Sequence, residues 1–488
     1  MIRSATFAGR QVAVFGLGLS GTPTVASLLA GGAIVAAWDD SENSRQAAKT
    51  AGLPVIDLNA ADWSRFSALI LAPGVPLTHP EPHWTVKLAQ AAGIEIIGDI
   101  ELFARERQAV APAAPFIGIT GTNGKSTTTA LAAHLLKSLG LDVQMGGNIG
   151  VPILALEPPA ADRFHVIELS SFQIDLTPTL QPTVGVLLNI TPDHIDRHGT
   201  LAHYAAVKER LVAGAEAMVV GTDDAITRVV AERVAEHGRL YPFTTGKGAA
   251  IVPRLYAIGT TLFVHEMHGV YASSTQIANL DSAPNLRGRH NVQNALAALT
   301  AIRALQDRLE AQGSTIKVWR PVELAAGLRT FPGLVHRMED VGSIGRVRFV
   351  NDSKATNADS TDKALAAFQR DIFWILGGKA KEGGIEGLSV YFGGIAKAYL
   401  IGAATENFAV TLDGKVAFER CGTIDVAVAH AARDAAAFAM ARPGASPVVL
   451  LSPACASYDQ FRSFEHRGDV FRDLVATLPG HTPRAGPA

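Results

Sequence analysis

The chain has 488 residues, of which 48% are hydrophobic and 18% are charged, a composition that excludes a largely disordered protein. This length is too great for a single hydrophobic core and predicts two to four domains. The 43 Lys and Arg residues nearly balance the 45 Asp and Glu residues, leaving a net charge of −2, so neither nucleic acid nor an acidic membrane surface is an expected partner.

Cysteine content and hydropathy predict the compartment. The chain contains two cysteines, Cys421 and Cys455, which lie far apart in sequence, and two thiols in a chain of this size predict a reducing compartment without a disulfide framework. The weakly apolar stretch 11–38 is longer than the apolar region of a signal peptide and is interrupted by several glycines and a proline. No uninterrupted run of about 18 apolar residues predicts a transmembrane helix. We therefore expect a cytoplasmic protein.

The first domain is predicted to begin with a strand–helix–strand unit. A short apolar strand at 11–15 precedes the sequence GLGLSG at 16–21, which opens a helix ending near residue 30. The next strand, 34–38, ends before Asp39, where a ribose-binding acid would lie in a nucleotide-binding fold. Alternatively, these glycines do not bind a nucleotide and serve only to let the helix pack closely against the strand. A further strand, 68–71, leads into the breaker cluster APGVP at 72–76, where open α/β sheets place ligands.

The extended, proline-rich segment 111–115 marks the first predicted domain boundary. After it, an apolar strand at 116–120 leads into GTNGKST at 121–127, a candidate phosphate-binding loop. Glycines allow backbone N–H groups to converge on an anion at a helix N-terminus, while Lys125 would contact the terminal phosphates and Ser126 would bind Mg²⁺. The general phosphate-loop pattern has glycine where this chain has Ile119, so an ordinary strand-to-helix connection is the alternative.

Strands and helices alternate through the rest of the second domain and predict a mostly parallel sheet covered by helices. Residues 241–290 show little regular pattern. A hinge is predicted at Phe331, Pro332 and Gly333, after which the alternation resumes. The fold class is therefore α/β with three domains, at 1–112, 113–331 and 332–488. The predicted strands of the second and third domains are 164–169, 184–189, 217–220, 348–350, 372–376, 398–401 and 448–451, and the predicted helices are 127–139, 204–213, 291–306 and 423–441.

Several polar segments follow predicted strands. Glu168 ends a buried-looking strand and is a candidate magnesium ligand, because an isolated buried carboxylate is expensive. NITPDHIDRH at 189–198 could form a transition-metal site through its two histidines and Asp196, or a solvated loop. NDSKATN at 351–357 and SPACAS at 452–457 are either functional loops or simple turns. On base rates Lys208 would be a surface lysine.

Taken together, these segments resemble the Mur ligases, the ATP-dependent amide-bond ligases of peptidoglycan synthesis. The resemblance covers nearly the whole chain, through GLGLSG, GTNGKST, GGNIG (146–150), ELSSFQ (168–173), NITPDHIDRH, GRHNVQNALAA (288–298), GLVHRME (333–339), NDSKATN and LSPACASYDQF (451–461). GTNGKST is typical of the wider family, which includes folylpolyglutamate synthetases. NDSKATN and SPACASYDQF resemble the branch that adds D-glutamate.

The resemblance implies an N-terminal Rossmann-like domain that binds a UDP-sugar, a central ATPase domain of the phosphate-loop type and a C-terminal Rossmann-like domain that binds the amino acid and nucleotide. It implies ATP and two Mg²⁺ ions as cofactors, and UDP-N-acetylmuramoyl-L-alanine and D-glutamate as substrates of cytoplasmic peptidoglycan precursor synthesis. A monomer without nucleic-acid or membrane partners is expected.

The resemblance also implies a role for individual residues. The implied catalytic residues are Lys125, His194, Lys208 and Lys354, with Lys208 matching a carbamylated lysine. Metal ligands would be Ser126, Glu168, His194 and Lys208. The implied nucleotide-contacting residues are Gly121, Thr122, Asn123, Gly124, Lys125, Ser126, Thr127, Asn291, Asn294, Arg337 and Asp352. The implied substrate-contacting residues are Leu19, Ser20, Asp39, Asn148, Thr356, Lys381, Ser457 and Phe464. Lys379 is the alternative to Lys381 as the lysine that faces the amino acid. Ala72 stands where the family commonly has a serine.

Three other functions remain open on the sequence. An oxidoreductase that uses a dinucleotide would explain the segment 16–39 but leaves GTNGKST without a role. A nucleotide-binding regulator would bind ATP without turnover. A sibling ligase would add a different amino acid.

Overall fold

The structure is a computed structural model that describes residues 1–483 apart from 237, 247–251, 269–270, 287 and 381–383, and the side chains of 267, 268, 271 and 272 are also outside the description. The chain divides into two compact units, Met1–Phe331 and Pro332–Ala488. They contain three sheets, in which parallel pairing dominates. The predicted α/β class is confirmed, and the three-domain boundaries stay a prediction.

The first sheet of the N-terminal unit is fully parallel, with four strands in the order β2-β1-β3-β4. Its strands are β1 (Gln11–Phe15), β2 (Ile34–Trp38), β3 (Ala68–Leu71) and β4 (Glu95–Ile97). Their apolar runs end at glycine or polar residues, and the first three strands have the predicted bounds. The helices are α1 (Gly21–Ala30), α2 (Glu42–Thr50), α3 (Trp84–Ala91) and α4 (Asp99–Val110).

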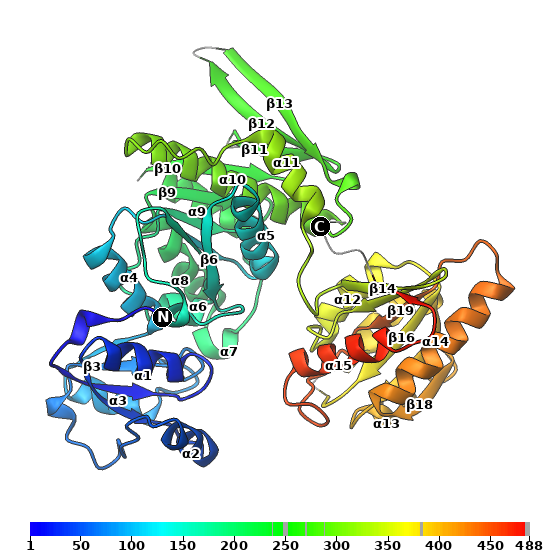
Figure 1. Cartoon of the computed structure of the whole chain (residues 1–488), viewed down its shortest axis with the longest axis horizontal. Coiled ribbons are helices and arrows are strands. Elements are labelled where there is room, and N and C mark those ends of the chain that lie inside the picture. The colour runs from blue at the N-terminus through cyan, green and yellow to red at the C-terminus, as the bar shows by residue number, and fades with distance from the viewer. Residues whose placement is uncertain (237, 247–251, 269–270, 287, 381–383, 484–488) are drawn as a thin grey trace. The chain divides into compact units, whose positions relative to one another are not determined.

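A nine-stranded sheet forms the rest of the N-terminal unit, in the order β13-β12-β11-β10-β9-β8-β5-β7-β6. Helices α5, α10 and α11 pack together on one face, and α6, α8 and α9 pack together on the other (Figure 1). The central strands are β5 (Phe116–Thr120), β6 (Asp142–Gly147), β7 (Arg163–Glu168), β8 (Val184–Leu187), β9 (Ala217–Gly221) and β10 (Arg239–Thr244). The helices are α5 (Lys125–Ser138), α6 (Ser171–Asp175), α7 (Ile195–His198), α8 (Leu201–Ala213), α9 (Ala225–Ala235), α10 (Arg289–Ala311) and α11 (Pro321–Thr330).

The region 241–290, whose sequence shows little regular pattern and received no assigned elements, does contain regular strands. This region contains β11 (Leu255–Ile258), β12 (Thr261–His268) and β13 (Tyr271–Asn279), which pair antiparallel at one edge of the sheet. Figure 1 shows β12 and β13 extending away from the helical layers. An edge hairpin buries little apolar surface, so its sequence does not need the continuous apolar runs of a central parallel strand.

One hydrophobic cluster joins the two sheets of the N-terminal unit. It contains Val12 and Val14 of β1 together with Phe116 of β5, Ile167 of β7 and Leu211 of α8. The segment predicted as a linker is held against the second sheet, because Arg107 donates from Nε to the Ala114 carbonyl at 2.8 Å and from a terminal nitrogen to Thr183 Oγ1 at 3.1 Å. Apolar packing and hydrogen bonds thus connect the two sheets of the N-terminal unit.

The C-terminal unit contains a seven-stranded sheet in the order β18-β17-β16-β19-β15-β14-β20, with β14 antiparallel to both of its neighbours. Helices α14 and α15 contribute to the cluster on one face, and α12 and α13 to the cluster on the other. The strands are β14 (Glu339–Ile344), β15 (Val347–Asn351), β16 (Ile372–Gly377), β17 (Ile395–Ile401), β18 (Phe418–Gly422), β19 (Val448–Leu451) and β20 (His481–Thr482). The helices are α12 (Ala358–Ala367), α13 (Thr405–Leu412), α14 (Ile424–Ala441) and α15 (Phe464–Ala476).

Within the described residues, no helix combines the length and the low charge needed to cross a bilayer.

Candidate active site

The second glycine turn, residues 121–127, connects β5 to α5 and has a preformed backbone. Gly124 adopts φ +85°, and a Cβ atom there would lie 2.2 Å from Asn294 Oδ1, so only glycine fits this position without strain. The Thr122 N–H donates to the Asn189 carbonyl and the Asn123 N–H donates to Asn189 Oδ1, both at 2.9 Å. Asn189, which follows β8, therefore fixes the turn at the N-terminus of α5.

Two lysines lie against this turn. Lys125 Nζ donates to the carbonyls of Gly121 at 3.0 Å and Thr122 at 2.8 Å. Lys208 of α8 donates from Nζ to the same Gly121 carbonyl at 3.0 Å and to Thr120 Oγ1 at 3.1 Å. Lys208 is only 1% exposed, which contradicts the base-rate expectation of a surface lysine. Burial, and then the charge of Lys125, holds the pKa of Lys208 well below its usual value.

Glu168 at the end of β7 has the donor set that a cation needs. Its side chain is 1% exposed, and Oε1 accepts a hydrogen bond from Asn148 Nδ2 at 2.7 Å. Its other oxygen, Oε2, is buried without a hydrogen-bond partner among the described residues. An unpartnered buried carboxylate oxygen is costly, so the site fits a bound divalent cation. Asn148, predicted to contact substrate, therefore lies directly beside the predicted metal ligand.

Ser126 and Thr127 occupy the first turn of α5, where Ser126 is half-buried and Thr127 is 9% exposed. The predicted nucleotide contacts Asn291 and Asn294 lie in the first turns of α10. Asn294 donates from Nδ2 to Asn291 Oδ1 at 3.1 Å and accepts from Thr128 Oγ1 at 3.4 Å. The structure thus brings the start of α10 against the start of α5.

His194 caps the N-terminus of α7 in a left-handed conformation, with φ 53°. Its side chain is half exposed, its Nε2 lies 3.6 Å from Asp193 Oδ2, and its ring meets that of Phe172 edge-on at 5.0 Å. The alternative transition-metal set of His194, Asp196 and His198 is wrong, since it is not among the groups of described residues whose ligand atoms converge. His198 instead contacts Ser171 Oγ through Nε2 at 2.9 Å.

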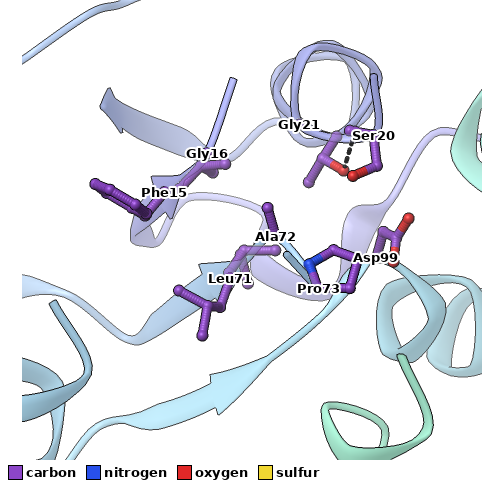
Figure 2. Close-up of a pocket in the computed structure, with 11 residues that line it drawn as sticks. Phe15, Gly16, Ser20, Gly21, Leu71, Ala72, Pro73 and Asp99 are labelled. Atoms are coloured by element: carbon purple, nitrogen blue, oxygen red, sulfur yellow. Dashed lines mark hydrogen bonds between the residues drawn. The ribbon is translucent and has the colours of Figure 1, made fainter. Parts of the chain in front are cut away.

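The first glycine turn, residues 16–21, lies between β1 and α1 and lines a small cavity (Figure 2). The cavity encloses about 10 Å³, room for about one water molecule, and Ser20 and Ala72 are among its lining residues. Asp39 lies outside the lining and accepts a hydrogen bond from the Leu17 N–H through Oδ2 at 2.7 Å. Leu19 is 92% exposed, so its side chain is available for contact with a ligand.

Asp99, at the start of α4, also lines this cavity and was not predicted from the sequence. Its side chain is 5% exposed, and its Oδ1 accepts from the Ile100 N–H at 3.0 Å. Burial raises its pKa to about 6. In the sequence, Asp99 appears only as an acid directly after Gly98, a pattern that ordinary helix N-termini also show and that therefore does not indicate a functional residue.

In the C-terminal unit, the segment 351–357 follows β15. Asp352 is 4% exposed and accepts from Ser452 Oγ at 2.8 Å and from the Met338 N–H at 3.2 Å. Burial raises the pKa of Asp352 to about 7. Lys354 is exposed, and its Nζ lies over the Phe464 ring, 4.0 Å from the centroid. Two predicted positions of the amino-acid site, Lys354 and Phe464, are therefore in contact.

Arg467 of α15 organises the same region and was missed. Its guanidinium is fully buried and donates to the carbonyls of Ser353 at 2.8 Å and Cys455 at 3.1 Å. It thereby joins the loop after β15 to the loop after β19. The spacing of Arg467, Phe471 and Val475 along one helix face gave a usable signal, because an arginine in phase with buried apolar residues is itself buried.

The remaining predicted site residues of the C-terminal unit differ in how far their side chains are exposed. Ser457 is 2% exposed, Thr356 and Arg337 are partly exposed, and Lys379 is exposed and pairs through its backbone with Ala456. Lys381 lies outside the described residues, so the choice between the two lysines stays a prediction.

Comparison with known proteins identifies the family. The Mur ligase middle domain matches residues 119–302, and the Mur ligase glutamate ligase domain matches residues 336–455. Together with the fold and the preformed glycine turn, these matches define the class: the chain belongs to the Mur ligase family.

Its relatives are similar along their whole length. The UDP-N-acetylmuramoylalanine–D-glutamate ligase of Chelativorans sp. (strain BNC1) is 54% identical over 98% of each chain. The protein of the same name from Brucella abortus (strain 2308) is 52% identical over 100% of each chain. A solved UDP-N-acetylmuramate–alanine ligase from Thermotoga maritima shares the fold, with a TM-score of 0.54 and 16% identity over 96% of this chain and 99% of its own. The MurF ligase from Thermotoga maritima, solved in complex with ADP, has a TM-score of 0.51 and 17% identity over 98% of both chains.

Proposed function

We propose that this Mur ligase joins D-glutamate to UDP-N-acetylmuramoyl-L-alanine, with hydrolysis of ATP to ADP and phosphate. The observation that carries this assignment is the identity of 52–54% along nearly the full chain with proteins named for that reaction. Relatives this similar over both the ATPase region and the C-terminal unit favour the same amino acid over that of a sibling ligase.

The second glycine turn is the proposed site of phosphoryl transfer. The N–H groups at the start of α5 and the Lys125 ammonium hold the terminal phosphates, and Asn291 and Asn294 support the nucleotide. The substrate's L-alanyl carboxylate attacks the γ-phosphorus, the bond to the bridging oxygen of ADP breaks, and an acyl phosphate forms. Because two anions must approach each other, the principal task of Lys125 is to offset negative charge.

Ser126, Glu168 and His194 are the proposed ligands of two Mg²⁺ ions, together with a carbamate on Lys208. Bound Mg²⁺ supplies positive charge that polarises the phosphoryl oxygens. What supports this assignment is the buried, unpartnered Glu168 Oε2. A carbamate on Lys208 is supported by the buried amine, whose two hydrogen-bond partners are both neutral. The neutral amine is the form that adds CO₂, and the lowered pKa of Lys208 favours it.

Amide formation completes the reaction. Lys354 and Phe464 are proposed to receive D-glutamate, since an ammonium complements the side-chain carboxylate and a ring limits the pocket's shape. Arg337, Asp352, Thr356, Lys381 and Ser457 are proposed to complete the nucleotide and amino-acid contacts of this unit. The amine of D-glutamate attacks the acyl carbon, phosphate leaves with the electron pair of the broken bond, and the amine loses a proton. Leu19, Ser20, Asp39 and Asn148 are the proposed contacts of the UDP-sugar.

The test is phosphate release by the full chain with ATP, Mg²⁺ and UDP-N-acetylmuramoyl-L-alanine. Single amino acids are added in turn: D-glutamate, L-glutamate, D-alanine and a diamino acid. We expect release only with D-glutamate and only when the UDP-sugar is present. Release with another amino acid alone would identify a sibling ligase, and ATP binding without any release would favour a regulator. Lys125→Ala serves as the inactive control.

A further inference from the structure

Three helices, α6, α7 and α8, bring together side chains that the proposed ligation does not use. Asp175 ends α6, His198 ends α7, and His203 lies in the first turn of α8. One ligand atom from each side chain lies within 4.8 Å of the other two. Two imidazoles and one carboxylate at this separation are a donor set for a metal ion.

His198 has one ring nitrogen in a hydrogen bond and the other without a partner among the described residues. It is 3% exposed, and its Nε2 is hydrogen-bonded to Ser171 Oγ at 2.9 Å. Its other nitrogen, Nδ1, is buried and has no hydrogen-bond partner among the described residues. A stacked Phe172 ring, at 5.2 Å and an interplanar angle of 4°, restrains the imidazole. Metal-bound histidines have this arrangement, with one nitrogen in a hydrogen bond and the other directed to the ion.

The other two side chains leave the site accessible. Asp175 accepts from Arg210 through Oδ1 at 3.2 Å, so Oδ2 can serve a cation. His203 is exposed, and its ring centroid lies 5.9 Å from that of His198. An exposed third ligand gives an ion an entry path and leaves a coordination position for water.

We propose that Asp175, His198 and His203 form a binding site for a transition-metal ion of borderline softness, with Zn²⁺ as the test ion. Imidazole nitrogen suits Zn²⁺ better than Mg²⁺, and this site offers two imidazoles where the site proposed at Glu168 offers one, so the two sites differ in chemistry. The ion would connect α6, α7 and α8, and would fix the four-residue helix that follows His194. The site does not depend on the proposed ligation.

A second group of ligand atoms, from Glu419, Cys421 and His430 in the C-terminal unit, is less suited to a cation. Both oxygens of Glu419 are already engaged, one by His430 Nδ1 at 2.5 Å and the other by Lys397 Nζ at 2.8 Å. At Asp175, by contrast, the bond from Arg210 occupies Oδ1.

The experiment is calorimetric titration of the full, chelator-treated chain with zinc chloride in the presence of excess Mg²⁺. We expect one Zn²⁺ per chain, with affinity lowered more than about 10-fold by His203→Ala and by Asp175→Asn. Because His203 is exposed, its truncation should leave the fold intact. The control His265→Ala removes an imidazole from β12 and should bind Zn²⁺ as the unmodified chain does.

Co²⁺ provides a second readout, because its visible absorption reports the ligand geometry. The spectrum expected for a low-coordinate nitrogen and oxygen site should disappear in His203→Ala and persist in His265→Ala. The proposal is overturned if Mg²⁺ displaces the ion, if His203→Ala binds Zn²⁺ unchanged, or if His430→Ala abolishes binding instead.

Discussion

The two glycine turns of the N-terminal unit share a local design and differ in the charges around them. Each follows a buried parallel strand and opens a helix, β1 to α1 in the first and β5 to α5 in the second. In the first turn the ionisable neighbours are acids, Asp39 on the Leu17 N–H and Asp99 in the cavity wall. In the second they include the amino groups of Lys125 and Lys208, with the Glu168 carboxylate nearby.

The difference teaches that glycines define the backbone and the surrounding side chains define the chemistry. A turn faced by acids suits hydroxyl groups such as those of a ribose, while a turn faced by the Lys125 ammonium and a cation site suits a triphosphate. Each prediction below changes one residue in or beside these turns, from the largest expected effect to the smallest.

Removing the buried lysine of the second turn should have the largest effect. We expect Lys208→Ala to lower kcat/KM for phosphate release by about 10²–10³-fold, because the carbamate proposed on this side chain, and with it a ligand of Mg²⁺, is lost. Lys137→Ala, which truncates an exposed lysine of α5, should retain full activity. If folded Lys208→Ala enzyme had a normal kcat/KM for phosphate release, the proposed chemical difference between the two glycine turns would be contradicted. Native mass spectrometry of the unmodified chain, showing the added mass of one CO₂, tests the carbamate separately.

Neutralising the buried acid beside the first turn should raise stability in a pH-dependent way. The pKa of Asp99 is raised to about 6, so its ionisation is disfavoured in the folded state and its charge destabilises the protein increasingly as pH rises from about 4 to 6. Asp99→Asn should therefore increase the free energy of unfolding at pH 8 by up to roughly 3 kcal/mol, with no gain near pH 4. Thermal unfolding across this range measures the difference. A gain of equal size at both pH values would assign the effect to packing instead.

Adding one methyl group should impair the use of ATP when it is placed in the second turn and should have no effect when it is placed in the first. In Gly124→Ala the new Cβ meets Asn294 Oδ1 at 2.2 Å at φ +85°, a strain of about 1–3 kcal/mol that should raise the KM for ATP at least about 10-fold. In Gly18→Ala the Cβ meets nothing within 4 Å, so both substrates should be used normally. Steady-state kinetics with each substrate varied in turn makes the comparison, and equal KM values for ATP in both variants would contradict it.

The smallest effect is expected at the exposed tip of the first turn. Leu19 is 92% exposed, so Leu19→Ala should leave the thermal midpoint unchanged. If its side chain is covered by the UDP-sugar, the KM for that substrate should rise about 5-fold, corresponding to roughly 1 kcal/mol of lost apolar contact, while the KM for ATP stays constant. Val322→Ala, on the exposed face of α11, is the matched control. An altered KM for ATP in Leu19→Ala would place the effect outside the first turn.

The central strands were predictable because fully buried parallel strands have continuous apolar runs. β5 and β19, which are buried throughout, and β1, which is buried from Val12 to Phe15, have the predicted bounds. The edge hairpin of β12 and β13 was not predicted, since backbone pairing rather than apolar burial holds such strands. Sequence order places the candidate loops at strand ends, but it does not determine which side chains are buried there.

Lys208 shows that limit most clearly. Its position four residues after buried Tyr204 and three before buried Leu211 places it on the inner face of α8. This periodicity indicated burial, whereas the general preference of lysine indicated exposure. The contacts with Thr120 and Gly121 come from a strand 88 residues away, and only the fold reveals them.

Arg467 has a mechanical consequence for the C-terminal unit. Because one guanidinium is anchored to both Ser353 and Cys455, the loops after β15 and β19 cannot shift independently without breaking its hydrogen bonds. The two loops behave as one rigid block, so attempts to redesign amino-acid selectivity should vary them jointly while this arginine is retained.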